Sequence, residues 1–171
     1  MDLQDYKSGK MYFDEYLSAD AALLLEMASS DYAHSSTEPF LLKACFLEPK
    51  SLTVIVALYR YYFYQHKYKD ALVAAFRAMQ VAAERVELED SWQKLNIKAL
   101  GYSAMRSMEL VRFYLLALKS AGYLNLRLGA HEEGVSMLEK VVELDKDDRL
   151  GALALLKTVK EAQQEDLSSL E

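Results

Sequence analysis

The sequence is poor in residues that interrupt helices. It contains two prolines and six glycines among 171 residues, too few for the many turns of an all-β protein. It also contains a single cysteine, Cys45, so neither an intrachain disulfide nor a thiolate zinc site can form. We expect Cys45 to be a small buried side chain.

Basic clusters and long apolar runs are also missing. The sequence has no cluster of five Lys or Arg residues, and its net charge is −6. A nucleic-acid partner is therefore not expected, because it requires a dense basic face. The densest apolar run, LTVIVALY, ends at Arg60, far short of the roughly 20 residues that span a membrane. Since the first ten residues also lack a signal-peptide pattern, we expect a cytoplasmic protein with no membrane partner.

What the sequence does contain is enough apolar residues for a sizeable core. Hydrophobic residues make up 52% of the chain and charged residues 27%, which suits one domain with a polar surface. The apolar residues recur at helical spacing over residues 18–164, which we expect to form a helical-repeat domain. Residues 1–17 are expected to be a partly loose N-terminal segment, and residues 165–171 an acidic C-terminal tail.

Prolines and capping residues predict where the first helices begin and end. Pro39 fits the first turn of a helix, where its missing N–H costs little, and that helix ends before Pro49. The aromatic-rich helix that follows begins at Ser51 or Thr53.

The second half of the chain has fewer such signals. Residues 92–128 contain no proline, and we expect two helices there with a break at residues 106–108. Gly129 then ends a helix. The last helix has Asp147 or Asp148 at its N-terminal end, where a carboxylate complements the helix dipole.

Two stretches of the chain have apolar and small residues at matching positions when each is counted in a frame of 34 residues. A unit that starts at Leu52 has apolar or small residues at recurring positions, namely Ile55 at 4, Leu58 at 7, Tyr62 at 11, Ala71 at 20 and Ala78 at 27. Because each unit is one pair of helices with an apolar face, neighbouring units must stack to cover that face.

A second unit starts at Leu115. It has Gly122 at position 8, Gly134 at position 20 and Val141 at position 27. Pro49 matches the closing proline of an earlier, degenerate unit. The two clear units start 63 residues apart, so the middle of the chain is not a regular repeat.

These patterns resemble the tetratricopeptide repeat over roughly residues 20–148. In that family, small residues at positions 8, 20 and 27 allow the two helices of a unit to touch. Tyr59 departs from the family pattern at position 8 of the first clear unit. The resemblance implies an all-α fold: a short right-handed superhelix of antiparallel helix pairs, with about three irregular repeats and a capping helix.

A narrower resemblance concerns ALYRYYFYQHKYKDAL and residues 117–156. These stretches are similar to small bacterial proteins of this repeat class, some of which lie in nitrogen-fixation gene neighbourhoods. Within the chain, IKALGYSAMR and LKSAGYLNLR align Gly101 with Gly122, 21 residues later. That spacing is compatible with duplication and with chance.

The tetratricopeptide resemblance also implies a binding surface. In that family the first helix of each unit lines a concave groove, and exposed Tyr beside Arg is typical of binding hot spots. The matching positions define the candidate peptide-binding residues Val56, Arg60, Phe63, Tyr64, Lys119, Tyr123, Leu126 and Arg127. The Lys and Asn clamp of some family members is not expected, because Tyr123 stands where an Asn is required.

Two interpretations of the aromatic-rich stretch remain open. The six aromatic residues within residues 59–68 either pack inside the protein or line a groove for a partner. The N-terminal segment, with Tyr12, Phe13 and Tyr16, is a candidate to cover part of that groove.

No residue arrangement supports catalysis or metal binding. His34, His66 and His131 lie far apart near expected helix ends, without further ligands at metal-binding spacing. No nucleophile, base and orienting residue can be assembled. We therefore expect no metal, no cofactor and no enzymatic activity, and a small-molecule enzyme is only a remote alternative.

The sequence thus predicts a non-catalytic protein–protein interaction module, an adaptor that binds a polypeptide segment in the groove. The alternative is a dedicated chaperone for a client protein, of the bacterial secretion type, since several such chaperones share this repeat class. A homodimer is a further alternative, because the end faces of a short array need covering.

Overall fold

The computed structural model describes residues 15–30, 37–89 and 91–168, and within these ranges it is helical without strands. The elements are α1 (Ala19–Ser30), α2 (Thr37–Leu47), α3 (Leu52–Tyr64), α4 (Tyr68–Val86), the short 3₁₀ helix η1 (Trp92–Lys94), α5 (Ile97–Arg127), α6 (His131–Leu144) and α7 (Ala152–Ser168). The predicted all-α class is confirmed for the part of the chain described.

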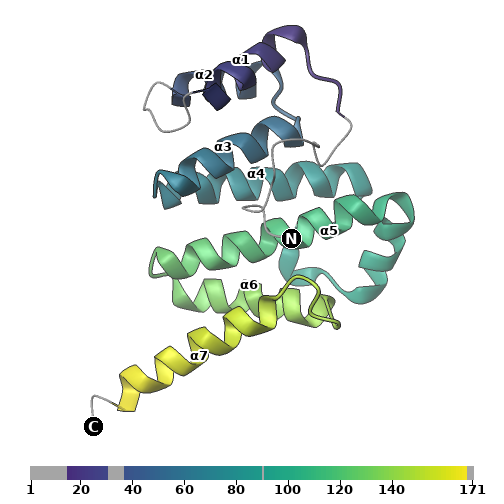
Figure 1. Ribbon diagram of the computed structural model, residues 1–171. Coiled ribbons are helices and arrows are strands. Elements are labelled where there is room, and N and C mark those ends of the chain that lie inside the picture. Colours follow the sequence, from purple (N-terminus) through teal and green to yellow (C-terminus); the bar gives the residue numbers. More distant parts are fainter. Residues whose placement is uncertain (1–14, 31–36, 90, 169–171) are drawn as a thin grey trace.

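Consecutive helices lie side by side as antiparallel pairs: α1 with α2, α3 with α4, and the second half of α5 with α6. The pairs stack along one direction, and α7 packs against α6 at the end of the stack (Figure 1). Buried alanines form a stripe along α4, at Ala71, Ala75, Ala78 and Ala82. Such small side chains leave room for α3 and α5, which both pack against α4.

The predicted break in residues 106–108 is confirmed. Ser107 has φ −157° and ψ 106°, an extended conformation that divides α5 into two halves. Its Oγ accepts a hydrogen bond from the N–H of Leu110 at 3.2 Å, so Ser107 caps the second half of α5. Gly129 follows α5 with φ +83°, a left-handed conformation that suits glycine at a helix end.

The last helix begins later and ends later than the sequence suggested. α7 starts at Ala152, after a turn in which Asp148 and Gly151 have φ +48° and +67°. Asp148 still caps it, because its Oδ1 accepts a hydrogen bond from the N–H of Leu153 at 3.0 Å. The helix continues to Ser168, past residue 164, where we expected the acidic tail to begin.

Two glycines allow α5 and α6 to touch. A Cβ added to Gly134 would lie 2.8 Å from the carbonyl oxygen of Gly122, and one added to Gly122 would lie 3.1 Å from the carbonyl oxygen of Gly134. The first distance is shorter than real Cβ contacts, and a backbone atom cannot easily move aside. Gly101, which aligned with Gly122 in the sequence, has nothing within 4 Å of such a Cβ, so the two glycines play different roles.

We therefore predict that Gly134→Ala lowers the free energy of unfolding by about 1–3 kcal/mol, because the methyl group forces α5 and α6 apart. Urea unfolding followed by circular dichroism measures this change. Gly101→Ala is the matched control and should leave stability unchanged or raise it by up to about 1 kcal/mol, since alanine favours an open helical position. Equal effects of the two substitutions would contradict the close contact.

The start of the described chain is held to the first turn of α3 by Glu15. Its carboxylate accepts hydrogen bonds from Ser51 Oγ at 2.8 Å, from Leu52 N at 3.2 Å and from Thr53 N at 3.0 Å, and it forms an ion pair with Arg85. Burial raises the pKa of Glu15, but these hydrogen bonds outweigh it and hold the pKa below the ordinary 4.5.

We predict that Glu15→Gln lowers the free energy of unfolding by about 1–2 kcal/mol at pH 7, because charge-assisted hydrogen bonds at a helix start are weakened. The carboxylate stabilises the fold above its unfolded pKa, and this stabilisation is lost as the pH falls through the lowered native pKa. The difference between the variant and the wild type should therefore vanish in urea titrations below that pH. Glu139→Gln, which changes an exposed pair with Lys160, serves as the control; a similar loss there would contradict the assignment.

Candidate functional site

Aromatic rings from α3, α4 and α5 meet where these helices begin or end. Phe63 lies at the centre, with its ring centroid 6.0 Å from those of Tyr64 and Tyr68 and 6.1 Å from that of Tyr123. These separations are typical of favourable ring contacts. Together with Arg127, these four residues are called the α3–α5 cluster below.

Arg127 completes this cluster from the last turn of α5. Its guanidinium carbon lies 4.7 Å from the ring centroid of Tyr68 and 5.8 Å from that of Tyr123. Its Nη1 donates a hydrogen bond to Tyr123 Oη at 2.8 Å. Two rings and one hydrogen bond thus hold the guanidinium in a fixed orientation, as cation–π contacts with tyrosine allow.

The cluster has an exposed side. Tyr64 is 51% exposed, and Arg127 is also exposed. Among the described residues, no carboxylate lies within ion-pair distance of Arg127, whereas nearby Lys67 is paired with Glu38. The hydrogen bond from Lys67 lowers the pKa of Glu38, so this pair stays ionised. Arg127 is therefore oriented without being neutralised within the part of the chain described.

The remaining predicted groove residues differ in their burial and surroundings. Val56 is buried and Arg60 is half-buried. Lys119 Nζ donates a hydrogen bond to the carbonyl oxygen of Leu150 at 2.7 Å, which holds the turn before α7. Leu126 packs against Gly134, between α5 and α6.

Phe63, Tyr64, Tyr123 and Arg127 of the predicted set come together in the cluster. Tyr68 is a fifth member that the sequence did not single out for binding. The sequence could have indicated this, because Tyr68 follows the short turn between α3 and α4. A residue at that position lies close to the end of α3.

The aromatic-rich stretch is partly buried and partly exposed, so internal packing accounts for some of its rings and a role in binding stays a prediction for the others. Tyr59, Tyr61 and Tyr62 are buried and belong to the core. Tyr64 faces solvent. Tyr16 is 93% exposed and does not cover these rings, while Tyr12 and Phe13 lie outside the described residues.

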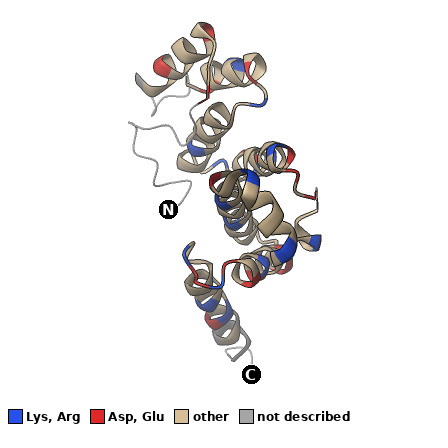
Figure 2. Ribbon diagram, turned by 90° about the vertical axis from the view of Figure 1, so that its right-hand side faces the viewer, with Lys and Arg blue, Asp and Glu red and all other residues tan. Residues whose placement is uncertain are grey.

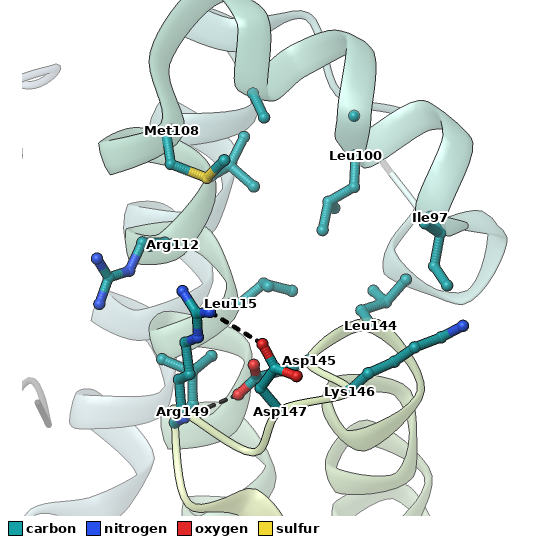
Figure 3. A pocket seen from close by; sticks show the side chains of 14 residues that line it. Ile97, Leu100, Met108, Arg112, Leu115, Leu144, Asp145, Lys146, Asp147 and Arg149 are labelled. Atoms are coloured by element: carbon teal, nitrogen blue, oxygen red, sulfur yellow. Dashed lines mark hydrogen bonds and ion pairs between the residues drawn. The ribbon is translucent and has the colours of Figure 1, made fainter.

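A pocket of about 520 Å³ lies between the two halves of α5 and the turn that leads from α6 to α7 (Figure 3). Its walls are mainly apolar and include Ile97, Leu100, Met108, Leu115, Leu144 and Leu150. At its base, Arg149 pairs with Asp147 at 2.9 Å, and Asp145 Oδ2 accepts a hydrogen bond from the N–H of Leu150 at 2.7 Å. The kink at Ser107 turns the first half of α5 away from the line of the second, so that both halves line this pocket.

Other kinds of site receive no support from the residues that the structure describes. They contain no group of three or more His, Cys, Asp or Glu residues arranged for a metal ion. His66 contacts the hydroxyl of Tyr68 at 2.8 Å, His131 is the first residue of α6, and His34 lies outside the described ranges. Basic and acidic residues are interspersed over the helices (Figure 2). No described helix is long and apolar enough to cross a membrane.

Comparison with known proteins gives one informative match. The chain is 47% identical over 167 residues to an uncharacterized 19.8 kDa protein in the nifW 5′ region of Azotobacter chroococcum mcd 1, and the alignment covers 98% of this chain and 93% of that protein. This chain belongs to the family of that nifW-region protein.

The position of this relative agrees with the nitrogen-fixation neighbourhood that the narrower resemblance implied. No family model matches the chain, so membership of the tetratricopeptide family stays a prediction. No solved structure matches it either.

Cys45 in α2 is half-buried, less than the full burial expected from the sequence, and its reactivity tests how α1 and α2 pack. Burial raises the pKa of the Cys45 thiol to about 11. Since the thiolate is the nucleophile and an ordinary thiol has a pKa near ~8.5, we predict that native Cys45 reacts with a disulfide reagent at pH 8 at least about 100-fold more slowly than the urea-unfolded protein. Comparable rates, measured by absorbance of the released thiol, would show that α2 does not shield it.

Proposed function

We propose that this protein is a non-catalytic protein–protein interaction module that binds a polypeptide segment at the α3–α5 cluster. The observation that carries the proposal is the exposed guanidinium of Arg127, which is oriented by Tyr68 and Tyr123. Arg and Tyr are the residues that most often dominate binding energy at protein interfaces.

The chemistry of the cluster favours a segment with an acidic group next to an aromatic or aliphatic side chain. A guanidinium binds a carboxylate through two parallel hydrogen bonds, and Arg127 retains N–H groups beyond the one given to Tyr123. The exposed ring of Tyr64 offers apolar area beside it. Because the guanidinium is already oriented, little side-chain entropy is lost on binding.

The tetratricopeptide-like arrangement is part of this proposal. Gly122 and Gly134 stand at positions 8 and 20 of their unit, where the repeat pattern has small residues. Their backbones approach each other closely, as that pattern expects. The stacked pairs then correspond to about three irregular repeats, with α7 as the capping helix of a short right-handed superhelix. Given the relative in the nifW 5′ region, we place the partner among proteins encoded in nitrogen-fixation neighbourhoods.

We predict that Arg127→Glu and Tyr64→Ala each reduce recovery of the native partner about tenfold or more, because hot-spot losses of about 2 kcal/mol are typical of such residues. Tagged protein is purified from the organism that encodes it, and bound polypeptides are quantified by mass spectrometry. Arg106→Glu, a change of the same charge at an exposed arginine outside the cluster, is the control and should have no effect on recovery.

Two results of this experiment would count against the proposal. If both variants keep their circular dichroism spectrum and recover the same partner as the wild type, the cluster is not the binding site. If the bound protein is an otherwise insoluble client held one-to-one, and neither substitution releases it, the chaperone alternative replaces the adaptor.

A further inference from the structure

The pocket at the kink of α5 has the shape and chemistry of a receptor for a helix. Ile97 and Met108 stand at its edges with 49% and 59% of their side chains exposed, and Leu100 and Leu115 lie between them. The pocket therefore continues an apolar surface rather than enclosing a small molecule. An apolar ridge of a helix, with residues one turn apart, fits such a surface.

Charged side chains flank the pocket on two sides. Arg112 and Lys146 extend away from it in opposite directions (Figure 3). Both carboxylates at the base are engaged, Asp147 with Arg149 and Asp145 with a backbone N–H. Neither Arg112 nor Lys146 has an ion-pair partner among the residues described, so the mouth of the pocket favours a ligand with an acidic group on each flank.

The helix α1 has these features. Leu23 and Met27, one turn apart, are 55% and 42% exposed. At 100° per residue, Asp20 and Glu26 lie on opposite sides of this apolar pair, and both are exposed. α1 is also the end helix of the stack, and the end element of an array needs a polar outer face or a cover.

We propose that α1 of one copy of this chain docks in the α5–α6 pocket of a second copy, with Asp20 and Glu26 meeting Arg112 and Lys146. A copy cannot fill its own pocket, because α1 lies at one end of the stack and α6 near the other (Figure 1). Charge favours this pairing over the two symmetric ones. If α1 packed against α1, carboxylates would face carboxylates, and if pocket packed against pocket, cations would face cations. The proposal uses no residue of the α3–α5 cluster and does not depend on the proposed function.

Such a contact is heterologous, so it joins copies head to tail into chains or a ring rather than stopping at a symmetric dimer. A single helix in a pocket buries less than the roughly 1,200 Å² of a standard stable interface, so association is weak and depends on concentration. We expect the sedimentation mass of the full chain to rise above the 19.5 kDa monomer as the concentration approaches about 1 mM.

Substitutions at two exposed positions test the two sides of the contact separately. Leu23→Glu disables α1 and Met108→Glu disables the pocket, and each variant alone should remain monomeric in sedimentation velocity. An equimolar mixture should form a dimer and nothing larger, because one intact α1 and one intact pocket remain. Met105→Glu and Leu42→Glu, at exposed positions on α5 and α2 outside the contact, are matched controls that should associate like the wild type.

Other outcomes would overturn the proposal. A wild type that stays monomeric throughout this concentration range rules the contact out. Loss of association with Leu23→Glu but not with Met108→Glu would mean that α1 pairs with α1. A mixture of the two variants that stays monomeric, with both variants folded by circular dichroism, would show that α1 and the pocket do not recognise each other.

Discussion

Mutual covering of helix faces is the constraint on which this structure depends. Each helix pair has an apolar face that only its neighbour can bury, and α4, with its buried alanines, is packed between α3 and α5 in this way. The closest approach is between α5 and α6, where Gly122 and Gly134 bring two backbones into contact. The packing is therefore set by small side chains as much as by large ones.

Stacking also places distant parts of the sequence side by side. Phe63 lies in the last turn of α3 and Tyr123 near the end of α5, and their rings are in contact. Arg127 completes the group against Tyr68. The same packing leaves two surfaces open, the exposed side of the α3–α5 cluster and the pocket beside the α5 kink. Both surfaces offer apolar area next to cations, although the net charge of the protein is −6.

Local signals made the helices predictable. Pro39, Pro49 and Gly129 mark helix ends through their own backbone limits, and the break at Ser107 was expected without any knowledge of tertiary structure. The site was predicted only in part, because exposure depends on which element packs above a residue. Lys119 illustrates this. Its position in the repeat predicted a groove residue, but its ammonium group donates a hydrogen bond to the carbonyl oxygen of Leu150 in the turn before α7. The pocket could not be foreseen, since it requires the direction of the chain after the kink.

Packing of the second helix pair on the third brings Phe63 and Tyr123, 60 positions apart in the sequence, into contact, so this contact reports on the whole arrangement. A double-mutant cycle with Phe63→Leu and Tyr123→Leu, measured by urea unfolding, gives their interaction free energy. We expect a favourable coupling of about 0.5–1.5 kcal/mol, as found for aromatic pairs in contact. Additive effects, with no coupling beyond experimental error, would show that the two helix ends do not meet.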